Sequence, residues 1–250
     1  MDKLVYAALN GMKVIENRQA NTYNEMANVS TVGFKRSLNS AVIWRDLVAE
    51  DHLDSRAYPI LVGENYVDLA PGPMMQTGVN LDAYINDKGL LAVQGKDGTE
   101  AYTRRGDLKV SENGILTTGA GDLVLGDAGP ITIPPSSKIE LSDHGVLSVT
   151  PMGQDATVLV PIARLKLVNG DKVGLKIRPD GLYETPDAQP LPVDASIRLS
   201  VGALEGSSVS PVESMVQMIK DAREYEMHVR VIRNAKEMST SSTSMVRLDS

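Results

Sequence analysis

The 250-residue sequence contains no cysteine and few aromatic residues, and both shortages limit what the protein can be. Without cysteine there are no disulfides and no thiolate metal sites. Aromatic residues make up 4% of the chain, and Phe34 is the single phenylalanine. Since 42% of the residues are nevertheless hydrophobic, we expect a globular chain whose core consists mainly of Leu, Val, Ile, Ala and Met.

Long apolar runs and an excess of basic charge are also missing. No apolar run approaches the roughly 18 residues of a membrane span, so we expect no direct membrane insertion. Residues 1–19 have only a short, interrupted apolar stretch and no small-residue cleavage site, so we expect no cleaved signal peptide. The net charge is −7, and the acidic residues concentrate in the middle of the chain. Nucleic-acid binding requires a basic face, so we expect none.

Motifs of catalysis and cofactor binding are absent as well. The three histidines, His52, His144 and His228, are scattered, and none has a second ligand at metal spacing. The glycines of 119–126 lack the Gly-Lys-Ser/Thr of a phosphate loop. The acidic cluster within 46–54 lacks the residue order of a calcium loop. We therefore predict no catalytic residue, no metal, no cofactor and no small-molecule substrate.

The densest polar stretch of the middle is AYTRRGD, residues 101–107. Two interpretations of its adjacent cations stay open. Arg104 and Arg105 could bind an anion, or their charges could protect the edge of a strand from pairing with another chain.

The first 29 residues have an apolar periodicity of three and four, which predicts an amphipathic helix. The stripe consists of Leu4, Ala8, Gly11, Ile15, Arg18, Thr22, Met26 and Val29. Glycine in a helix interior costs about 1 kcal/mol relative to alanine. We therefore expect Gly11 to mark a close contact between helices.

The C-terminal segment begins with SPVE, residues 210–213, which is a capping box with proline at the first helical position. In this motif Ser210 accepts a hydrogen bond from the amide of Glu213, and the Glu213 side chain reaches back to Ser210. The periodicity that follows predicts a long amphipathic helix. Its stripe consists of Val212, Met215, Ile219, Ala222, Tyr225, Val229, Ile232, Ala235 and Met238. Ala222 is expected, like Gly11, to mark a close helix contact.

The middle of the chain has the pattern of short β-strands. From about residue 81 to 205, apolar runs of five to eight residues alternate with turn sequences, among them Asp97-Gly98, Asn113-Gly114 and Asp180-Gly181. These dipeptides supply the positive φ angles of tight hairpins. The regular spacing predicts an antiparallel sandwich or barrel.

These patterns together predict an α+β fold, with a central antiparallel β domain between long N- and C-terminal helices that pair as a coiled-coil-like bundle. We expect residues 1–33 and 207–250 to form the helical domain. Residues 81–206 form the β-rich domain. Residues 34–80, interrupted by prolines, form a short helix and an extended connector.

The stretch ANVSTVGFKR, residues 27–36, resembles the N-terminal signature of the rod and hook family of bacterial flagellar axial proteins: an Ala-Asn pair, then Thr-x-Gly-Phe and basic residues. Residues 101–118 and GPITIP at 129–134 are similar to the family's central β domain. Residues 202–226 are similar to its C-terminal motif. The form Leu-Glu-Gly-Ser followed by Val-Glu-x-Met is most similar to proximal-rod members, with distal-rod members the close alternative. The sequence departs from the family in GLLAVQ, residues 89–94, where two leucines replace aromatic residues.

Beside this resemblance, we interpret the signature physically as a joint. Asn28 ends the helix, Gly33 permits a turn, and Phe34 anchors the outgoing chain, followed by the cations Lys35 and Arg36. The predicted assembly surface comprises Leu4, Ala8, Gly11, Ile15, Met26, Asn28, Gly33, Phe34, Lys35, Arg36, Val212, Met215, Ile219, Ala222, Val229 and Ile232.

The resemblance implies a structural function. It implies a subunit of the flagellar rod in the basal body, whose terminal helices build the inner tube around the export channel and whose β domain faces outward. The implied partners are copies of the same chain, other rod subunits and the flagellar type III export apparatus, within the periplasmic space. Two other classes stay open: a ligand-binding or enzymatic β domain with helical oligomerisation ends, and a coiled-coil adaptor outside the flagellum.

Overall fold

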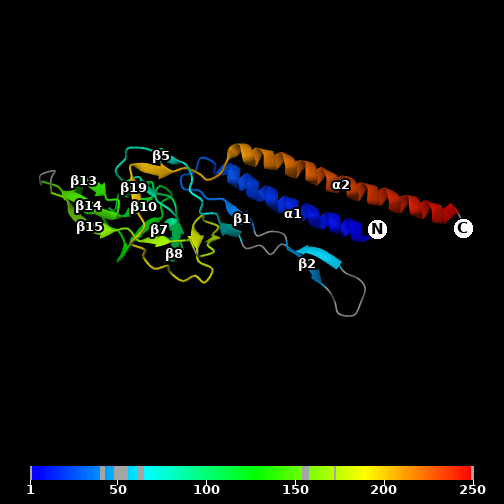
Figure 1. Cartoon of the computed structure of the whole chain (residues 1–250), viewed down its shortest axis with the longest axis horizontal. Coiled ribbons are helices and arrows are strands. Elements are labelled where there is room, and N and C mark those ends of the chain that lie inside the picture. Colours follow the sequence, from blue (N-terminus) through cyan, green and yellow to red (C-terminus); the bar gives the residue numbers. More distant parts are fainter. Residues whose placement is uncertain are drawn as a thin grey trace. The chain divides into compact units, whose positions relative to one another are not determined.

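The computed structural model describes residues 2–39, 43–47, 56–60, 65–153, 158–171 and 173–248. The chain divides into two compact units (Figure 1). The helical unit consists of residues 1–27, 39–64 and 210–250. The β unit consists of residues 28–38 and 65–209. The α+β class and the central antiparallel β domain predicted from the sequence are confirmed.

The helical unit contains helix α1 (Asp2–Ala27) and helix α2 (Pro211–Leu248), which lie side by side (Figure 1). They run in opposite directions, because Arg18 contacts Asp221 while Gly11, earlier in α1, lies against His228, later in α2. α2 has 38 residues and α1 has 26. α2 also continues through the Ser/Thr-rich residues 239–244, beyond the last residue of the predicted stripe.

The helical unit also contains the antiparallel strands β2 (Ile43–Leu47) and β3 (Arg56–Ile60). In the described part of 34–80 the regular elements are strands, so the short helix predicted within that range is not found there. Ile43 and Trp44 are β-branched and aromatic residues that favour a strand. Their pairing with Ile60 and Pro59 of β3 outweighs the weak local preference for a helix.

The face of α2 that contacts α1 differs from the predicted apolar stripe. Asp221, which contacts Arg18 of α1, is buried, as are Ser214 and the stripe residue Ala235, whereas Val212, Met215 and Ile219 are 69%, 54% and 55% exposed. The reason is Arg18, which lies on the α2-facing side of α1 and requires carboxylate partners that only the polar face of α2 supplies. The predicted stripe of α1 is correct at Ala8 and Ile15, which are buried.

The β unit is built from short strands. In addition to β1 (Ser37–Asn39), they are β4 (Asn65–Val67), β5 (Met74–Gln76), β6 (Ala83–Ile85), β7 (Gly89–Gln94), β8 (Glu100–Thr103), β9 (Leu108–Val110), β10 (Leu116–Thr118), β11 (Leu123–Gly126), β12 (Gly129–Pro130), β13 (Ser136–Leu141), β14 (Val146–Pro151), β15 (Val160–Arg164), β16 (Leu167–Asn169), β17 (Lys176–Ile177), β18 (Tyr183–Glu184), β19 (Leu199–Val201) and β20 (Ala203–Glu205).

The largest sheet has the order β1-β4-β17-β18-β8-β7-β11-β10-β9, with β12 beside β11 and β16 beside β7. Strands β13, β14 and β15 form a separate meander, and the pairs β19–β6 and β20–β5 complete the unit. Each strand pairing whose register is defined is antiparallel. The predicted turns agree, because Gly98, Gly114 and Gly181 have φ angles of 81°, 74° and 83°.

Strand β7 is buried on both faces and separates two apolar clusters. Leu91 and Val93 belong to the larger cluster, while Leu90 and Ala92 belong to the smaller one. This alternation follows from the period of two along a strand. The leucines that replace the family's aromatic residues are thus fully packed, at 0% and 2% exposure.

Candidate functional site: a joint fixed by buried charges

The joint segment, residues 28–36, follows directly after α1 and belongs to the β unit. Two local turns shape it, since the amide of Thr31 donates to Asn28 O at 3.1 Å and that of Phe34 donates to Thr31 O at 3.3 Å. Thr31 Oγ1 also donates to Asn28 Oδ1 at 3.1 Å. Asn28 therefore stands where the helix stops, as the sequence predicted, and its side chain supports the turn that redirects the chain.

Gly33 is the point at which only glycine fits. Its φ angle is +67°, and a Cβ atom placed there would lie 2.6 Å from the carbonyl carbon of Arg104. Its amide donates to Glu205 O at 2.7 Å, and Tyr183 Oη donates to Gly33 O at 3.4 Å. The left-handed backbone and the close approach both exclude a side chain.

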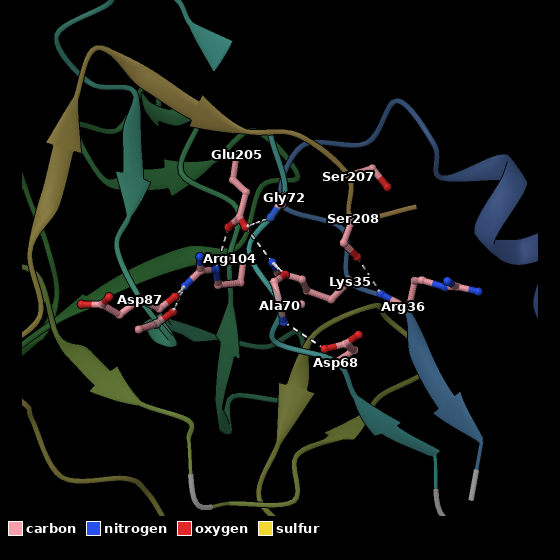
Figure 2. Close-up of polar contacts among 12 residues, drawn as sticks. Lys35, Arg36, Asp68, Ala70, Gly72, Asp87, Arg104, Glu205, Ser207 and Ser208 are labelled. Carbon is pink, nitrogen blue, oxygen red and sulfur yellow. Dashed lines mark hydrogen bonds and ion pairs between the residues drawn. The ribbon is translucent and has the colours of Figure 1, made fainter. Parts of the chain in front are cut away.

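The charge cluster, which consists of Lys35, Arg104 and Glu205, lies beneath the joint segment (Figure 2). All three side chains are 0% exposed. Lys35 Nζ donates to Glu205 Oε1 at 2.6 Å, and Arg104 Nε donates to Glu205 Oε2 at 2.6 Å. One carboxylate thus joins a cation from the N-terminal signature to a cation from the end of β8.

Backbone groups complete the coordination of these charges. Lys35 Nζ also donates to Ala70 O at 2.5 Å, and Glu205 Oε1 accepts from the amide of Gly72 at 2.7 Å. Arg104 Nη1 donates to Asp87 O at 2.8 Å and to Gly89 O at 2.6 Å. Arg104 Nη2 is buried and has no hydrogen-bond partner among the described residues. The cluster therefore ties five separate segments of the β unit together.

The two ionisable partners respond differently to this environment. Burial lowers the pKa of Lys35 below its ordinary value, in spite of the hydrogen bond from its ammonium to Glu205. Burial alone would raise the pKa of Glu205, but the hydrogen bond and charge of Arg104, with help from Lys35, outweigh it and lower that pKa. Glu205 is consequently held as a carboxylate, and the cluster carries an excess of positive charge when Lys35 is protonated.

The chain that leaves the cluster is bound on both sides. Ser208 N donates to Phe34 O at 3.0 Å, and Arg36 N donates to Ser208 Oγ at 3.2 Å (Figure 2). On the other side, Asp68 N donates to Arg36 O at 2.9 Å. The segment entering the β unit after α1 and the segment leaving it before α2 are therefore clamped to each other.

Arg104 and Arg105 follow neither of the two interpretations drawn from the sequence. Arg104 is a fully buried partner of Glu205, and Arg105 pairs with its near neighbour Asp107 at 2.7 Å. Sequence reasoning also missed Glu205. The available signal was a glutamate inside the short apolar strand Ala203–Glu205, where an unpaired charge would be costly.

The predicted cap of α2 is visible in the backbone geometry. Glu213 N donates to Ser210 Oγ at 3.4 Å, and Ser214 N donates to Ser210 O at 3.0 Å. Of the other predicted assembly residues, Leu4 lies in the first turns of α1, and Met26, Phe34 and Ile232 are half-buried.

Ala222 is exposed on α2 and so remains available for the close helix contact that was predicted for it in an assembly. Val229 is 36% exposed on the same open side of α2. His52 and all of the acidic cluster except Asp46, whose backbone lies in β2, fall outside the described residues.

The described residues contain no group of three or more His, Cys, Asp or Glu side chains placed to bind a metal ion. No helix in that part of the chain combines the length and the apolar character required to cross a bilayer.

Comparisons with known proteins place these features in a family. Residues 84–149 match the model of the flagellar hook protein FlgE/F/G D1 domain, and residues 200–245 match the C-terminal model of the flagellar basal body rod FlgEFG proteins. Arg104 lies in the first range and Glu205 in the second, so the buried ion pair joins the two matched regions.

Curated relatives cover nearly the whole chain. The flagellar basal-body rod protein FlgF of Salmonella typhimurium (strain LT2) is 36% identical over 244 residues, 95% of each chain. The FlgF protein of Escherichia coli (strain K12) is 35% identical over 239 residues, 93% of each chain. The rod protein FlgG of Buchnera aphidicola subsp. Schizaphis graminum is 30% identical over 251 residues, 90% of each chain.

Proposed function

Because this chain belongs to the family of flagellar basal-body rod proteins FlgF, we propose that it is a structural subunit of a bacterial flagellar rod. It polymerises through its terminal helices into a shaft that surrounds the export channel. Its partners are copies of itself, other rod subunits and the flagellar type III export apparatus. It acts without catalysis and without a cofactor, in the proximal rod within the periplasmic space.

The observation that carries this proposal is the apolar stripe of α2, which the single chain leaves in water. The stripe comprises Val212, Met215, Ile219, Tyr225 and Val229, which are 69%, 54%, 55%, 40% and 36% exposed. Apolar side chains in such a continuous row gain free energy when they leave water, and a contiguous exposed patch marks an interaction site. Neighbouring copies in a polymer supply the missing surface.

We infer that the helices pair in the manner of a coiled coil. The residues of α1 at the α2 contact are separated by three and four positions: Ala8, Gly11, Ile15, Arg18 and Thr22. This spacing is the heptad pattern of supercoiled helices. Residues 1–33 and 207–250 would then form the inner tube, and the β unit would face outward.

The clamp between the joint segment and residues 205–208 supports a load-bearing role. Torque transmitted through a shaft acts on the connections between parts of each subunit. Here both connections are fixed to the same buried carboxylate, Glu205, and to each other through Ser208. A second candidate, a distal-rod subunit, is favoured by the similarity to FlgG.

The test is a charged substitution in the exposed stripe. Met215→Glu combined with Ile219→Glu should leave the free chain folded by circular dichroism, because both side chains are already in water. In a strain that lacks the native gene, this variant should abolish swimming and leave basal bodies without a complete rod in electron micrographs. Lys220→Glu, on an exposed position of α2 outside the stripe, is the matched control and should assemble. Normal rods with the stripe variant would refute polymerisation through α2.

A further inference from the structure

The contact between α1 and α2 repeats every seven residues. Arg18 contacts Asp221, and seven residues away on each helix Gly11 lies against His228. The same spacing separates the buried residues Ala8, Ile15 and Thr22 of α1 from one another. A slide of one heptad, about 10 Å at 1.5 Å per residue, would therefore bring equivalent levels of the two helices opposite each other again.

Apolar packing alone does not choose among these registers. The repeated α1 residues are small or medium-sized, and α2 is longer than α1, with 38 residues against 26. The excess of α2 corresponds to about 18 Å of helix along which α1 could be displaced. The clamp between the joint segment and residues 205–208 restricts the helices where they join the β unit, and a polar contact between α1 and α2 can fix their position further along.

Asp221 has the properties of such a fixed point. Its side chain is 0% exposed, and its Oδ1 accepts from Arg18 Nε at 2.6 Å and from Gln217 Nε2 at 2.8 Å. Its Oδ2 is buried without a partner. Arg18 also contacts the carboxylate of Glu224, one turn further along α2. A buried carboxylate is tolerated only where a cation faces it, and Arg18 provides that cation.

We propose that the contact between Arg18 and Asp221 sets the axial register of the terminal helix pair. A slide by one heptad in one direction would place Gly11 opposite Asp221 and leave the buried carboxylate without a cation. A slide in the other direction would place Glu25 opposite Asp221 and bring two carboxylates together. Both neighbouring registers are penalised, and a single buried polar contact can specify register in this way at some expense of stability.

The register can be measured directly because the chain has no cysteine of its own. Spin labels on Lys13→Cys and Lys236→Cys would occupy exposed positions of α1 and α2, separated along the axis. Double electron–electron resonance on the full chain should show one narrow distance. In the background of Arg18→Met with Asp221→Leu, which replaces the ion pair by apolar groups, a second population should appear, displaced by about 10 Å along the axis.

The matched control is Lys88→Met with Asp171→Leu, which removes an exposed ion pair of the β unit, where the two side chains are 52% and 49% exposed. It should leave the single distance unchanged. Arg18→Asp alone should broaden or displace the distance, and the exchanged pair Arg18→Asp with Asp221→Arg should restore it. The exchanged pair decides the question if the apolar variant loses helicity. Retention of the single native distance in the apolar variant, failure of the exchanged pair to restore it, or a broad distribution in the parent chain would overturn the proposal.

Discussion

The two units of this molecule place apolar and charged side chains in opposite ways. In the β unit, apolar residues of β7 and β8 fill two closed clusters, and the charge cluster of Lys35, Arg104 and Glu205 is enclosed with its partners. In the helical unit, Asp221 of α2 faces Arg18 of α1, and most of the apolar stripe of α2 is exposed, with Ala235 buried. The β unit is therefore complete within one chain, whereas the helical unit still presents surface that a partner can bury.

The ion pairs of the two units also differ in how far solvent reaches them. In the charge cluster both partners of each ion pair are 0% exposed, so solvent cannot replace a lost contact. In the helical unit Asp221 is 0% exposed, but Arg18 is 38% exposed and Glu224 is 42% exposed. The first set of charges should govern stability, and the second should govern how the helices are aligned.

The largest loss of stability that this comparison predicts follows from removing the charge of Glu205. Glu205→Gln keeps the shape of the side chain but leaves Lys35 and Arg104 buried without a counterion. We expect the free energy of unfolding of the β unit to fall by about 3–5 kcal/mol. Urea unfolding of the full chain, followed by hydrogen–deuterium exchange of peptides that cover β7 and β8, would measure it.

The control for Glu205 is Asp171→Asn, because Asp171 pairs with Lys88 at the surface. An exposed pair contributes about 0–1 kcal/mol, so this variant should be nearly neutral. Equal destabilisation by the two substitutions would show that the charge cluster is not the electrostatic centre of the β unit.

A smaller effect is expected where the backbone of the joint segment meets β8. Gly33→Ala forces a side chain into a φ of +67° and against the Arg104 carbonyl, whereas Gly121→Ala meets a φ of +92° with open space around it. The conformational strain is common to both, at about 1–3 kcal/mol. Gly33→Ala should therefore cost more than Gly121→Ala in the same urea experiment, and the difference measures the close contact. A Gly33 variant that is no less stable than the Gly121 variant would contradict this tight approach.

Local patterns in the sequence predicted the elements of the β unit well. Asp97-Gly98, Asn113-Gly114 and Asp180-Gly181 each stand at a turn between antiparallel strands, because their positive φ angles are dictated by the residues themselves. Asn28 and Gly33 were identified for the same reason, since helix termination and a left-handed turn are local properties.

Long-range pairings were beyond the reach of those patterns. The contacts of Glu205 with Lys35 and Arg104 join residues 170 and 101 positions apart, so neither spacing nor periodicity reveals them. The orientation of α2 failed for a related reason. Its apolar stripe was assumed to pack on α1, but Arg18 recruits Asp221 and Glu224 and turns the polar face inward. Under the proposed function, the surface that covers the stripe belongs to a neighbouring subunit, so one sequence could not reveal it.

Substitutions at Gly11 would test how closely α1 and α2 approach each other. A Cβ atom there would lie 2.6 Å from the His228 ring, which is a movable side chain rather than backbone. Gly11→Ala should gain about 1 kcal/mol of helix propensity and lose part of it by displacing the ring. We therefore expect Gly11→Ala alone to be nearly neutral, and Gly11→Ala with His228→Ala to be more stable than His228→Ala by about 1 kcal/mol. Thermal unfolding monitored by helical circular dichroism would measure both, and an absent gain in the double variant would mean that another group limits the approach.

The smallest effect lies at a surface turn of the β unit, where the comparison predicts only a weak dependence on pH. Asp97, between β7 and β8, accepts hydrogen bonds from the amide and the hydroxyl of Thr99 at 3.1 and 2.8 Å, and its other oxygen lies 3.0 Å from Arg178. The hydrogen bonds of Thr99 and Arg178 to the carboxylate lower the pKa of Asp97 from 3.8 to about 2. A carboxyl group whose pKa is lower in the folded than in the unfolded state stabilises the fold above the unfolded value and loses that contribution as the pH falls through the folded value. The turn should therefore lose this contribution between about pH 4 and pH 2.

Carbon-13 titration of the Asp97 carboxyl by NMR should show the low pKa. Thr99→Val should raise that pKa, because two of the four interactions that lower it are hydrogen bonds from Thr99, and the Thr99 hydroxyl supplies one of them. The isolated ion pair between Lys138 and Glu140 on β13 offers a reference carboxyl without such a turn. An unshifted Asp97, or a pKa that Thr99→Val leaves unchanged, would show that this turn does not hold the carboxylate in the way its geometry indicates.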